Sequence, residues 1–241
     1  MSGHSKWSSI KRQKGVTDAK RGTLFTKLAN AITLAAREGG SDPNANFKLR
    51  LTIEKAKQAN MPKDNIERAA KRGTGEGSEK RIEEVIYEGF GPDGVAILIE
   101  SLTDNKNRTT PVIRGILGKK NGRLGENGSV SWMFERKGVI LVLPPEGSNK
   151  EEIELELIDL GAEDIKKEPE GFTIYTTPEK LEEIKEALDG KNYSVEYASI
   201  DLVAKTILGE SDISDPEKIS DLLEELENNE EVTNVYSNYE S

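Results

Sequence analysis

Residues 138–203 read GVILVLPPEGSNKEEIELELIDLGAEDIKKEPEGFTIYTTPEKLEEIKEALDGKNYSVEYASIDLV and carry the pattern that decides the fold class. Short runs rich in β-branched and aromatic residues alternate there with stretches whose apolar residues recur at helical spacing. The predicted elements are, in order, a strand at 139–143, a helix at 150–160, a hairpin at 164–176, a helix at 178–188 and a strand at 193–202. The order βαββαβ is that of a ferredoxin-like domain, also called a split βαβ unit.

The chain before this unit also begins with strands. Residues 84–90 and 94–102 have strand character, and the turn sequence Gly91-Pro92-Asp93-Gly94 joins them. A helix should follow, with Thr109 or Thr110 as its cap and Pro111 in its first turn. A further strand is predicted from the alternation of Val130, Trp132 and Phe134.

The tail of the chain holds one predicted helix, at 216–229, and one strand, at 232–236. A lone helix and a lone strand bury too little surface to fold by themselves. We therefore expect them to return to the sheet of residues 79–137. The second domain then comprises 79–137 plus 204–241, and 138–203 is inserted in it.

The first 78 residues are predicted to be helical. Apolar residues at helical spacing indicate helices at 23–38, 44–60 and 62–72, and the sequence GTGEGS at 73–78 is typical of a linker. Residues 1–22 have little apolar periodicity and suggest an arm or a weakly formed helix. The expected fold class is α+β: an N-terminal three-helix domain (1–78) followed by two α/β domains of ferredoxin-like character.

The charge of the chain is divided unevenly. The net charge is −10, yet residues 1–80 carry 17 Lys and Arg against 8 Asp and Glu, a balance of +9, and the remainder carries 17 against 36, a balance of −19. Such asymmetry points to a polyanionic partner, a nucleic acid or a membrane surface, on the basic side.

Composition disfavours several classes of function. There is no cysteine, which excludes disulfides and thiolate chemistry, and the only histidine is His4. Apolar runs are at most five residues long, too short to span a membrane. We therefore expect a cytoplasmic protein that is not an enzyme and has no metal, no cofactor and no membrane partner.

The basic start of the chain supplies the candidate nucleic-acid contacts. Lysine and arginine neutralise backbone phosphates, and an indole can stack on a base. The alternatives are a solvated arm and a Trp that packs on the helical domain. The candidates are Lys6, Trp7, Lys11, Arg12, Lys14, Lys20 and Arg21, and the surface is widened by Arg50, Lys57, Lys63, Arg68, Lys71 and Arg72.

A second group of cations surrounds the helix predicted near residues 106–123. These side chains are either another contact site or the polar face of a helix, and the latter is favoured. The group comprises Lys106, Arg108, Arg114, Lys119, Lys120 and Arg123. The glycines that follow, Gly118–Gly128, lack the pattern of a phosphate-binding loop and are interpreted as turn positions.

Several motifs of this sequence resemble those of the YebC/PmpR family, nearly from end to end. They are Gly3-His4-Ser5-Lys6-Trp7, Lys11-Arg12, Asp18-Ala19-Lys20-Arg21-Gly22, Phe25-Thr26-Lys27-Leu28, Asn60-Met61-Pro62-Lys63-Asp64-Asn65-Ile66, Tyr87-Glu88-Gly89, Gly91-Pro92, Asp104-Asn105-Lys106-Asn107-Arg108-Thr109 and Gly122–Gly128 with Ser129-Val130. Thr110-Pro111 departs from the family pattern, although a proline suits the first turn of a helix.

The resemblance implies a three-domain, non-enzymatic protein that binds DNA and regulates transcription. Relatives, including the mitochondrial translational activator, act at the ribosome on difficult sequences such as proline runs, so a translation factor that binds ribosomal RNA remains an alternative. A small-ligand sensor, with a cleft between ferredoxin-like domains, is a more remote one. By similarity, the best nucleic-acid candidates are His4, Lys6, Lys11, Arg12, Lys20, Arg21 and Lys27, with Arg108 and the Gly122–Gly128 loop second.

Overall fold

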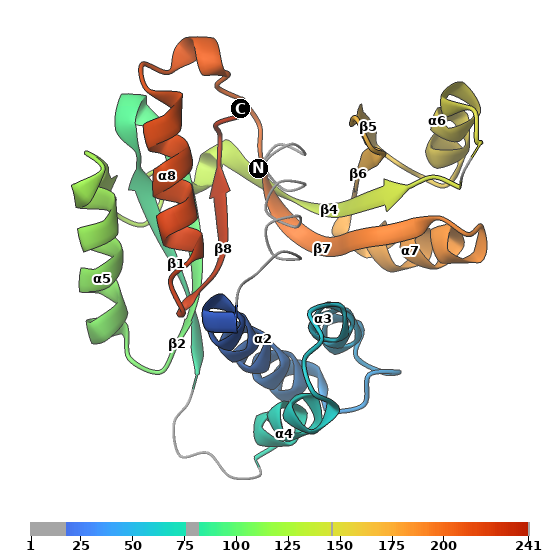
Figure 1. Ribbon diagram of the computed structural model, residues 1–241, viewed down its shortest axis with the longest axis horizontal. Coiled ribbons are helices and arrows are strands. Elements are labelled where there is room, and N and C mark those ends of the chain that lie inside the picture. The colour runs from blue at the N-terminus through green and yellow to red at the C-terminus, as the bar shows by residue number, and fades with distance from the viewer. Residues whose placement is uncertain (1–17, 76–81, 146, 241) are drawn as a thin grey trace.

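The computed structural model describes residues 18–75, 82–145 and 147–240, except for the side chains of residues 18–20, 150 and 151. Within these ranges, three helices precede two antiparallel four-stranded sheets, which confirms the predicted α+β class. Figure 1 shows the helices beneath the two sheets, which lie side by side and are joined by the long strands β4 and β7.

The helical domain consists of α2 (Asp18–Gly39), α3 (Phe47–Gln58) and α4 (Lys63–Gly73). Asn46 fixes the turn between α2 and α3, because its side chain accepts the N–H of Leu49 and its amide donates to the carbonyl of Ala35. Gly73 lies so close to α2 that a Cβ there would be 2.4 Å from the carbonyl oxygen of Thr33. These contacts hold three short helices as one unit.

Helix α2 begins at Asp18, five residues before the predicted start. Residues 18–22 have no apolar periodicity, but Ala19, Lys20 and Arg21 are good helix formers. Of the two alternatives for residues 1–22, an arm or a weakly formed helix, the helix is the one observed over residues 18–22.

The first sheet has the strand order β3-β1-β2-β8. Helices α5 and α8 pack on one face of it and form a core with Ile97, Ile113 and Leu222. Strand β8 pairs with β2, so the tail of the chain returns to this sheet. The bounds are β1 Glu83–Phe90, β2 Ala96–Thr103, α5 Lys106–Lys119, β3 Arg123–Leu124, α8 Pro216–Glu227 and β8 Val232–Ser237.

Helix α5 starts earlier than predicted. Asn105 caps it by accepting the N–H of Asn107, and Pro111 lies inside the helix instead of in its first turn. The prediction of Thr109 or Thr110 as the cap is therefore wrong. The Thr110 hydroxyl instead donates to the carbonyl four residues earlier in the same helix, and the Thr109 hydroxyl donates to the carboxylate of Glu231.

The second sheet has the order β5-β6-β4-β7, as expected for a ferredoxin-like domain. Helices α6 and α7 cover one face, where Ile140, Leu157 and Ile184 are buried together. The bounds are β4 Phe134–Leu143, α6 Lys150–Asp159, β5 Asp164–Lys167, β6 Phe172–Thr176, α7 Leu181–Gly190 and β7 Ser194–Ala204.

The two sheets share a core at the start of β4. Phe134 and Ala204 pack with Leu98 and Tyr236 of the first sheet, on the face opposite α5 and α8. The strand predicted from Val130, Trp132 and Phe134 is not formed, because residues 131–133 make a 3-10 turn and β4 begins at Phe134. Only two of the three side chains are buried, and Trp132 is exposed.

Candidate nucleic-acid interface

Most of the N-terminal candidates lie outside the residues that the structure describes. They are His4, Lys6, Trp7, Lys11, Arg12 and Lys14. Lys20 is in the first turn of α2, where its side chain is not described, and Arg21 beside it is exposed. Their assignment to nucleic-acid binding stays a prediction.

Lys27 makes a contact inside the protein. Its ammonium group donates a hydrogen bond to the backbone carbonyl of Glu227, at the C-terminal end of α8. Burial lowers the pKa of Lys27 to about 8, although the charge of Glu227 acts in the opposite direction. A cation at this position complements the negative end of the helix dipole. Lys27 therefore attaches α2 to the first α/β domain, and this role competes with the phosphate contact that the resemblance implies.

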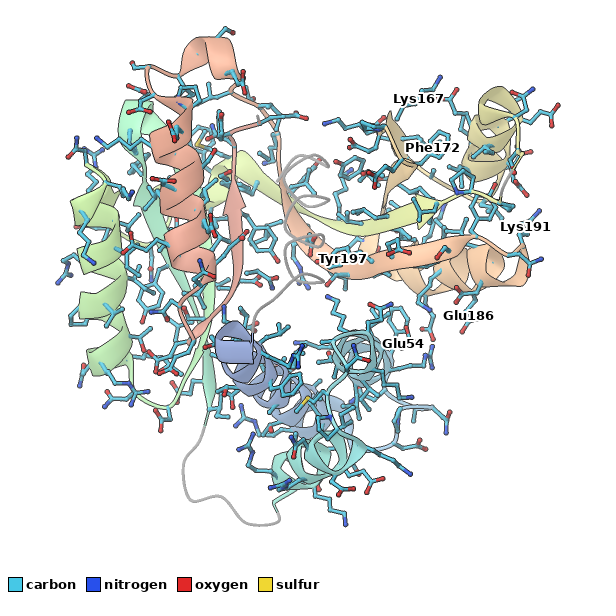
Figure 2. All side chains as sticks on the ribbon, viewed as in Figure 1. Glu54, Lys167, Phe172, Glu186, Lys191 and Tyr197 are labelled. Carbon is cyan, nitrogen blue, oxygen red and sulfur yellow. The ribbon has the colours of Figure 1, made fainter. Side chains whose placement is uncertain are left out.

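A second set of contacts attaches the helical domain to the ferredoxin-like domain. Arg50 of α3 forms an ion pair with Glu182 of α7, and Lys185 of α7 lies 3.2 Å from the carboxylate of Glu54. The ammonium of Lys55 is 4.4 Å from the ring centroid of Tyr197 on β7. Figure 2 shows Glu54 and Tyr197 at this boundary.

An open groove of about 300 Å³ follows the same boundary. Its lining includes apolar residues such as Leu51 and Val195 and charged ones such as Lys57 and Asp189. Cavities of this size are at the lower limit for small-molecule sites, which are usually more apolar and more enclosed.

Three exposed cations of the helical domain donate to neither a carboxylate nor a backbone carbonyl within the described residues. Lys57 and Lys71 are exposed, and Arg68 donates to the neutral side-chain amide of Asn65. Arg68 and Lys71 are three residues apart on α4 and so are neighbours on its surface. We call Lys57, Arg68 and Lys71 the outer cations. Their charge is available to an external anion.

The cations around α5 are mostly paired inside the protein. Lys119 and Lys120 lie 3.2 and 2.9 Å from Glu225 and Asp221 of α8, respectively. These pairs join the two helices of the first domain, which supports the interpretation of this group as a helix surface. Arg114 is exposed, and the guanidinium of Arg123 stacks 4.8 Å from the ring centroid of Phe90.

Arg108 belongs to a cluster centred on a single carboxylate, that of Glu231. The guanidinium of Arg108 pairs with Glu231 and with Asp104, and these two acids raise the pKa of Arg108. Thr109 donates to the other oxygen of Glu231 at 2.8 Å, and Thr103 donates at 3.2 Å to the oxygen that Arg108 binds. The motif of residues 104–109 thus fixes the start of α5 against the turn between α8 and β8. Sequence reasoning missed Glu231 because it lies 123 positions from Arg108.

The glycine-rich loop before β4 is also held by one carboxylate. Glu88 is only 7% exposed and accepts backbone N–H groups from Gly128, Val130 and Ser131 at 2.7, 2.7 and 2.9 Å. Burial raises the pKa of Glu88, but the three donors outweigh it and hold the pKa below its ordinary value. Within the loop, a Cβ at Gly122 would be 2.6 Å from the carbonyl oxygen of Phe90. The glycines therefore meet backbone requirements, as the sequence predicts.

No group of three or more acidic or histidine side chains in the described ranges is placed to hold a metal ion. Of the helices in that same part of the chain, none has the length and apolar character needed to cross a bilayer.

Comparison with known proteins gives matches along almost the whole chain. The model of the TACO1/YebC protein N-terminal domain matches residues 5–76, and that of the TACO1/YebC second and third domain matches residues 82–239. A protein of Thermoanaerobacter pseudethanolicus, named probable transcriptional regulatory protein, is 48% identical over 240 residues, which are 100% of this chain and 97% of that protein. A protein of the same description from Chlorobium phaeobacteroides is 50% identical over 241 residues, covering 100% of this chain and 96% of the relative.

A solved structure shows the same fold. The crystal structure of a conserved hypothetical protein from Aquifex aeolicus has a TM-score of 0.83 and 44% sequence identity, and the match covers 92% of this chain and 91% of that one. Two family models together match most of the sequence, and full-length relatives are nearly half identical to it. This chain belongs to the TACO1/YebC family.

Proposed function

We propose that this protein is a cytoplasmic, non-enzymatic regulator of gene expression that binds DNA through its N-terminal segment and helical domain. Its relatives carry the name probable transcriptional regulatory protein, which supports a regulatory role. Residues 1–80 carry a net positive charge although the whole chain has a net charge of −10, so a polyanion should approach the molecule at this part.

The observation that carries the proposal is the uneven pairing of cations. Lys119 and Lys120 of the first α/β domain have carboxylate partners on α8, whereas the outer cations have none within the described residues. An unpaired surface cation can contact a phosphate without breaking an ion pair, whereas a paired one must first give up its partner, at a cost of about 0.2–1 kcal/mol. Phosphate contacts of this kind dominate non-specific affinity for nucleic acid.

The test measures how binding to a labelled DNA duplex depends on salt, by fluorescence anisotropy. Each phosphate contact contributes about 0.9 to the slope of log K against log salt, so Arg68→Glu/Lys71→Glu should lower the slope by about 2. Replacing Lys11, Arg12, Lys20 and Arg21 with Glu should abolish binding. Unchanged slopes and affinities in both variants would exclude this interface.

A matched control reverses two exposed cations of the ferredoxin-like domain, Lys167 and Lys191, which Figure 2 shows away from α2–α4. Lys167→Glu/Lys191→Glu has the same charge change and should leave DNA affinity within about twofold, since neither side chain belongs to the proposed interface.

Ribosome cosedimentation at equal ionic strength distinguishes the two nucleic acids. Retention on ribosomes with weak duplex binding would replace the transcriptional role with that of a translation factor that contacts ribosomal RNA, because phosphate contacts serve both.

A further inference from the structure

Trp132 is the most exposed large apolar side chain of the described residues. It is 67% exposed, in the 3-10 turn between the glycine-rich loop and β4. Tryptophan is usually largely buried in a folded domain, so an exposed indole calls for a functional explanation.

The turn that carries Trp132 is firmly held. Glu88 binds the N–H of Val130 and that of Ser131, on either side of the turn's start, and the N–H of Met133 donates to the carbonyl of Val130. The indole N–H donates to the carbonyl of Ser129 at 3.2 Å. This bond uses the polar edge of the ring and leaves its faces free. The ring is therefore displayed on a fixed backbone.

Two cations lie on segments that adjoin this turn, Lys205 in direct contact with it and Arg123 at the start of the preceding loop. Lys205, which follows β7, donates from its ammonium to the carbonyl of Trp132 at 2.8 Å and from its backbone to the carbonyl of Met133 at 2.9 Å. Arg123 begins the loop, and its guanidinium stacks on Phe90, which packs against the same core as Met133. Neither cation has a carboxylate partner among the described side chains. Between residues 123 and 131 the one acid is Glu126.

A single flat ring among cations fits a nucleobase better than a protein partner. A stable protein interface needs roughly 800 Å² on each side with an apolar centre, and one indole with its charged neighbours does not supply that. Aromatic side chains bind single strands by stacking on bases, while nearby cations follow the phosphates. Because RNA commonly presents unpaired bases in loops, and DNA is mostly paired, the chemistry favours RNA.

We propose that Trp132 is a stacking platform for an unpaired base of RNA, with Lys205 and Arg123 as contacts to the flanking phosphates. The proposal rests on the proposed function in one respect, namely that the chain engages nucleic acid. It adds a second site, on the junction between the two sheets, that is separate from the helical domain.

The test uses the two tryptophans of the chain, Trp7 and Trp132. In full-length protein with Trp7→Phe, the intrinsic fluorescence comes from Trp132 alone. Titration with a single-stranded RNA 12-mer should quench this emission, because a stacked base quenches an indole, whereas an RNA duplex of the same sequence should not. Trp132→Ala in the otherwise natural chain should weaken single-strand binding by about tenfold and leave duplex affinity unchanged.

Leu155→Ala is the matched control, since Leu155 of α6 is 65% exposed but has no part in the site. Its RNA affinity should equal that of the natural chain. If the natural chain binds neither RNA nor DNA, the proposed function fails as well. If it binds, but Trp132 emission does not respond or Trp132→Ala loses equal affinity for both RNA forms, only the stacking site is overturned.

Discussion

Replacing Glu88 with Gln tests whether one buried carboxylate organises the loop that carries Trp132. Two backbone N–H groups donate to one oxygen of Glu88 and a third donates to the other. The amide oxygen of a glutamine can serve only one side, so its NH₂ group would face a backbone donor. Hydrogen bonds to an ionised acceptor contribute about 1.5–3 kcal/mol each and are about twice as strong as neutral ones. Losing one bond and weakening two should lower the free energy of unfolding by about 2–4 kcal/mol.

Urea unfolding at pH 7, followed by circular dichroism, measures this loss. Glu126→Gln is the control, because Glu126 is an exposed acid of the same loop and its replacement should change stability by less than about 0.5 kcal/mol. In the Trp7→Phe background, the emission of Trp132 should also shift in Glu88→Gln, since its turn loses its anchor.

The pH dependence gives the experiment a second, independent check. The pKa of Glu88 is lowered in the folded protein, so its stabilising effect is complete above the unfolded value of about 4.5 and is lost as the pH falls through the folded value. The difference between the natural chain and Glu88→Gln should therefore be constant from pH 6 to 8 and shrink below pH 4.5. A variant as stable as the natural chain at pH 7, or a difference that grows in acid, would refute the reasoning.

Two further predictions concern the contacts between elements. The pKa of Lys27 falls from 10.5 to about 8 on folding. Between pH 8 and 10.5 Lys27 is therefore protonated in the unfolded chain but largely neutral in the folded one, and the free energy of unfolding should rise with pH over this range. Lys27→Met should remove that rise. When urea unfolding is measured at pH 7 and at pH 10, the stability of the natural chain relative to the variant should increase by about 2 kcal/mol between the two. Glu231→Ala should lower the free energy of unfolding by about 1–3 kcal/mol, because Thr103 and Thr109 lose their hydrogen-bond acceptor. Arg108→Ala should lower the melting temperature less, since that side chain is 53% exposed, and the reverse order would contradict a cluster centred on Glu231.

The regular elements of this fold are visible in the sequence because they depend on local periodicity. The strand at 139–143 and the helix at 150–160 have apolar residues at the spacing that their burial requires. The helix forms within one residue of the predicted bounds, and the strand ends where predicted but begins five residues earlier, at Phe134. The ferredoxin-like strand order follows from that element order once the strands pair.

The predictions for the start of α5 and for a strand through Trp132 are wrong because a hydrogen bond overrides the local sequence signal. Pro111 resembles the first residue of a helix, but Asn105 supplies a stronger cap five positions before the predicted first turn, and the helix continues through the proline. Alternation predicted a strand through Trp132, whereas the carboxylate of Glu88 draws the preceding backbone into a turn. Neither outcome can be read from periodicity alone, because each depends on a hydrogen bond.

The pairing of charges could not be predicted either, since partners lie far apart in the chain. Arg50 and Glu182 are 132 positions apart, yet they join the helical domain to α7. Counting cations from the sequence therefore overestimates the charge that a nucleic acid can meet. A count treats Arg50, Lys119 and the outer cations alike, whereas the structure shows that, among the residues it describes, Arg50 and Lys119 are paired with carboxylates and the outer cations are not.

Among the described residues, the motifs around Glu88 and Arg108 that carry the family resemblance serve to build the fold. Glu88 and the glycines after it fix a loop, and the residues around Arg108 fix α5 to Glu231. Within the described residues, the candidates for a binding surface are the groups that take no part in such contacts. They are the outer cations and the indole of Trp132 beside Lys205. The two sets lie on different domains, so one nucleic acid could engage both only by reaching from the helical domain to the junction of the sheets. If they act together, Arg68→Glu/Lys71→Glu and Trp132→Ala should reduce affinity for one RNA more than additively, whereas independent sites would give additive losses in free energy.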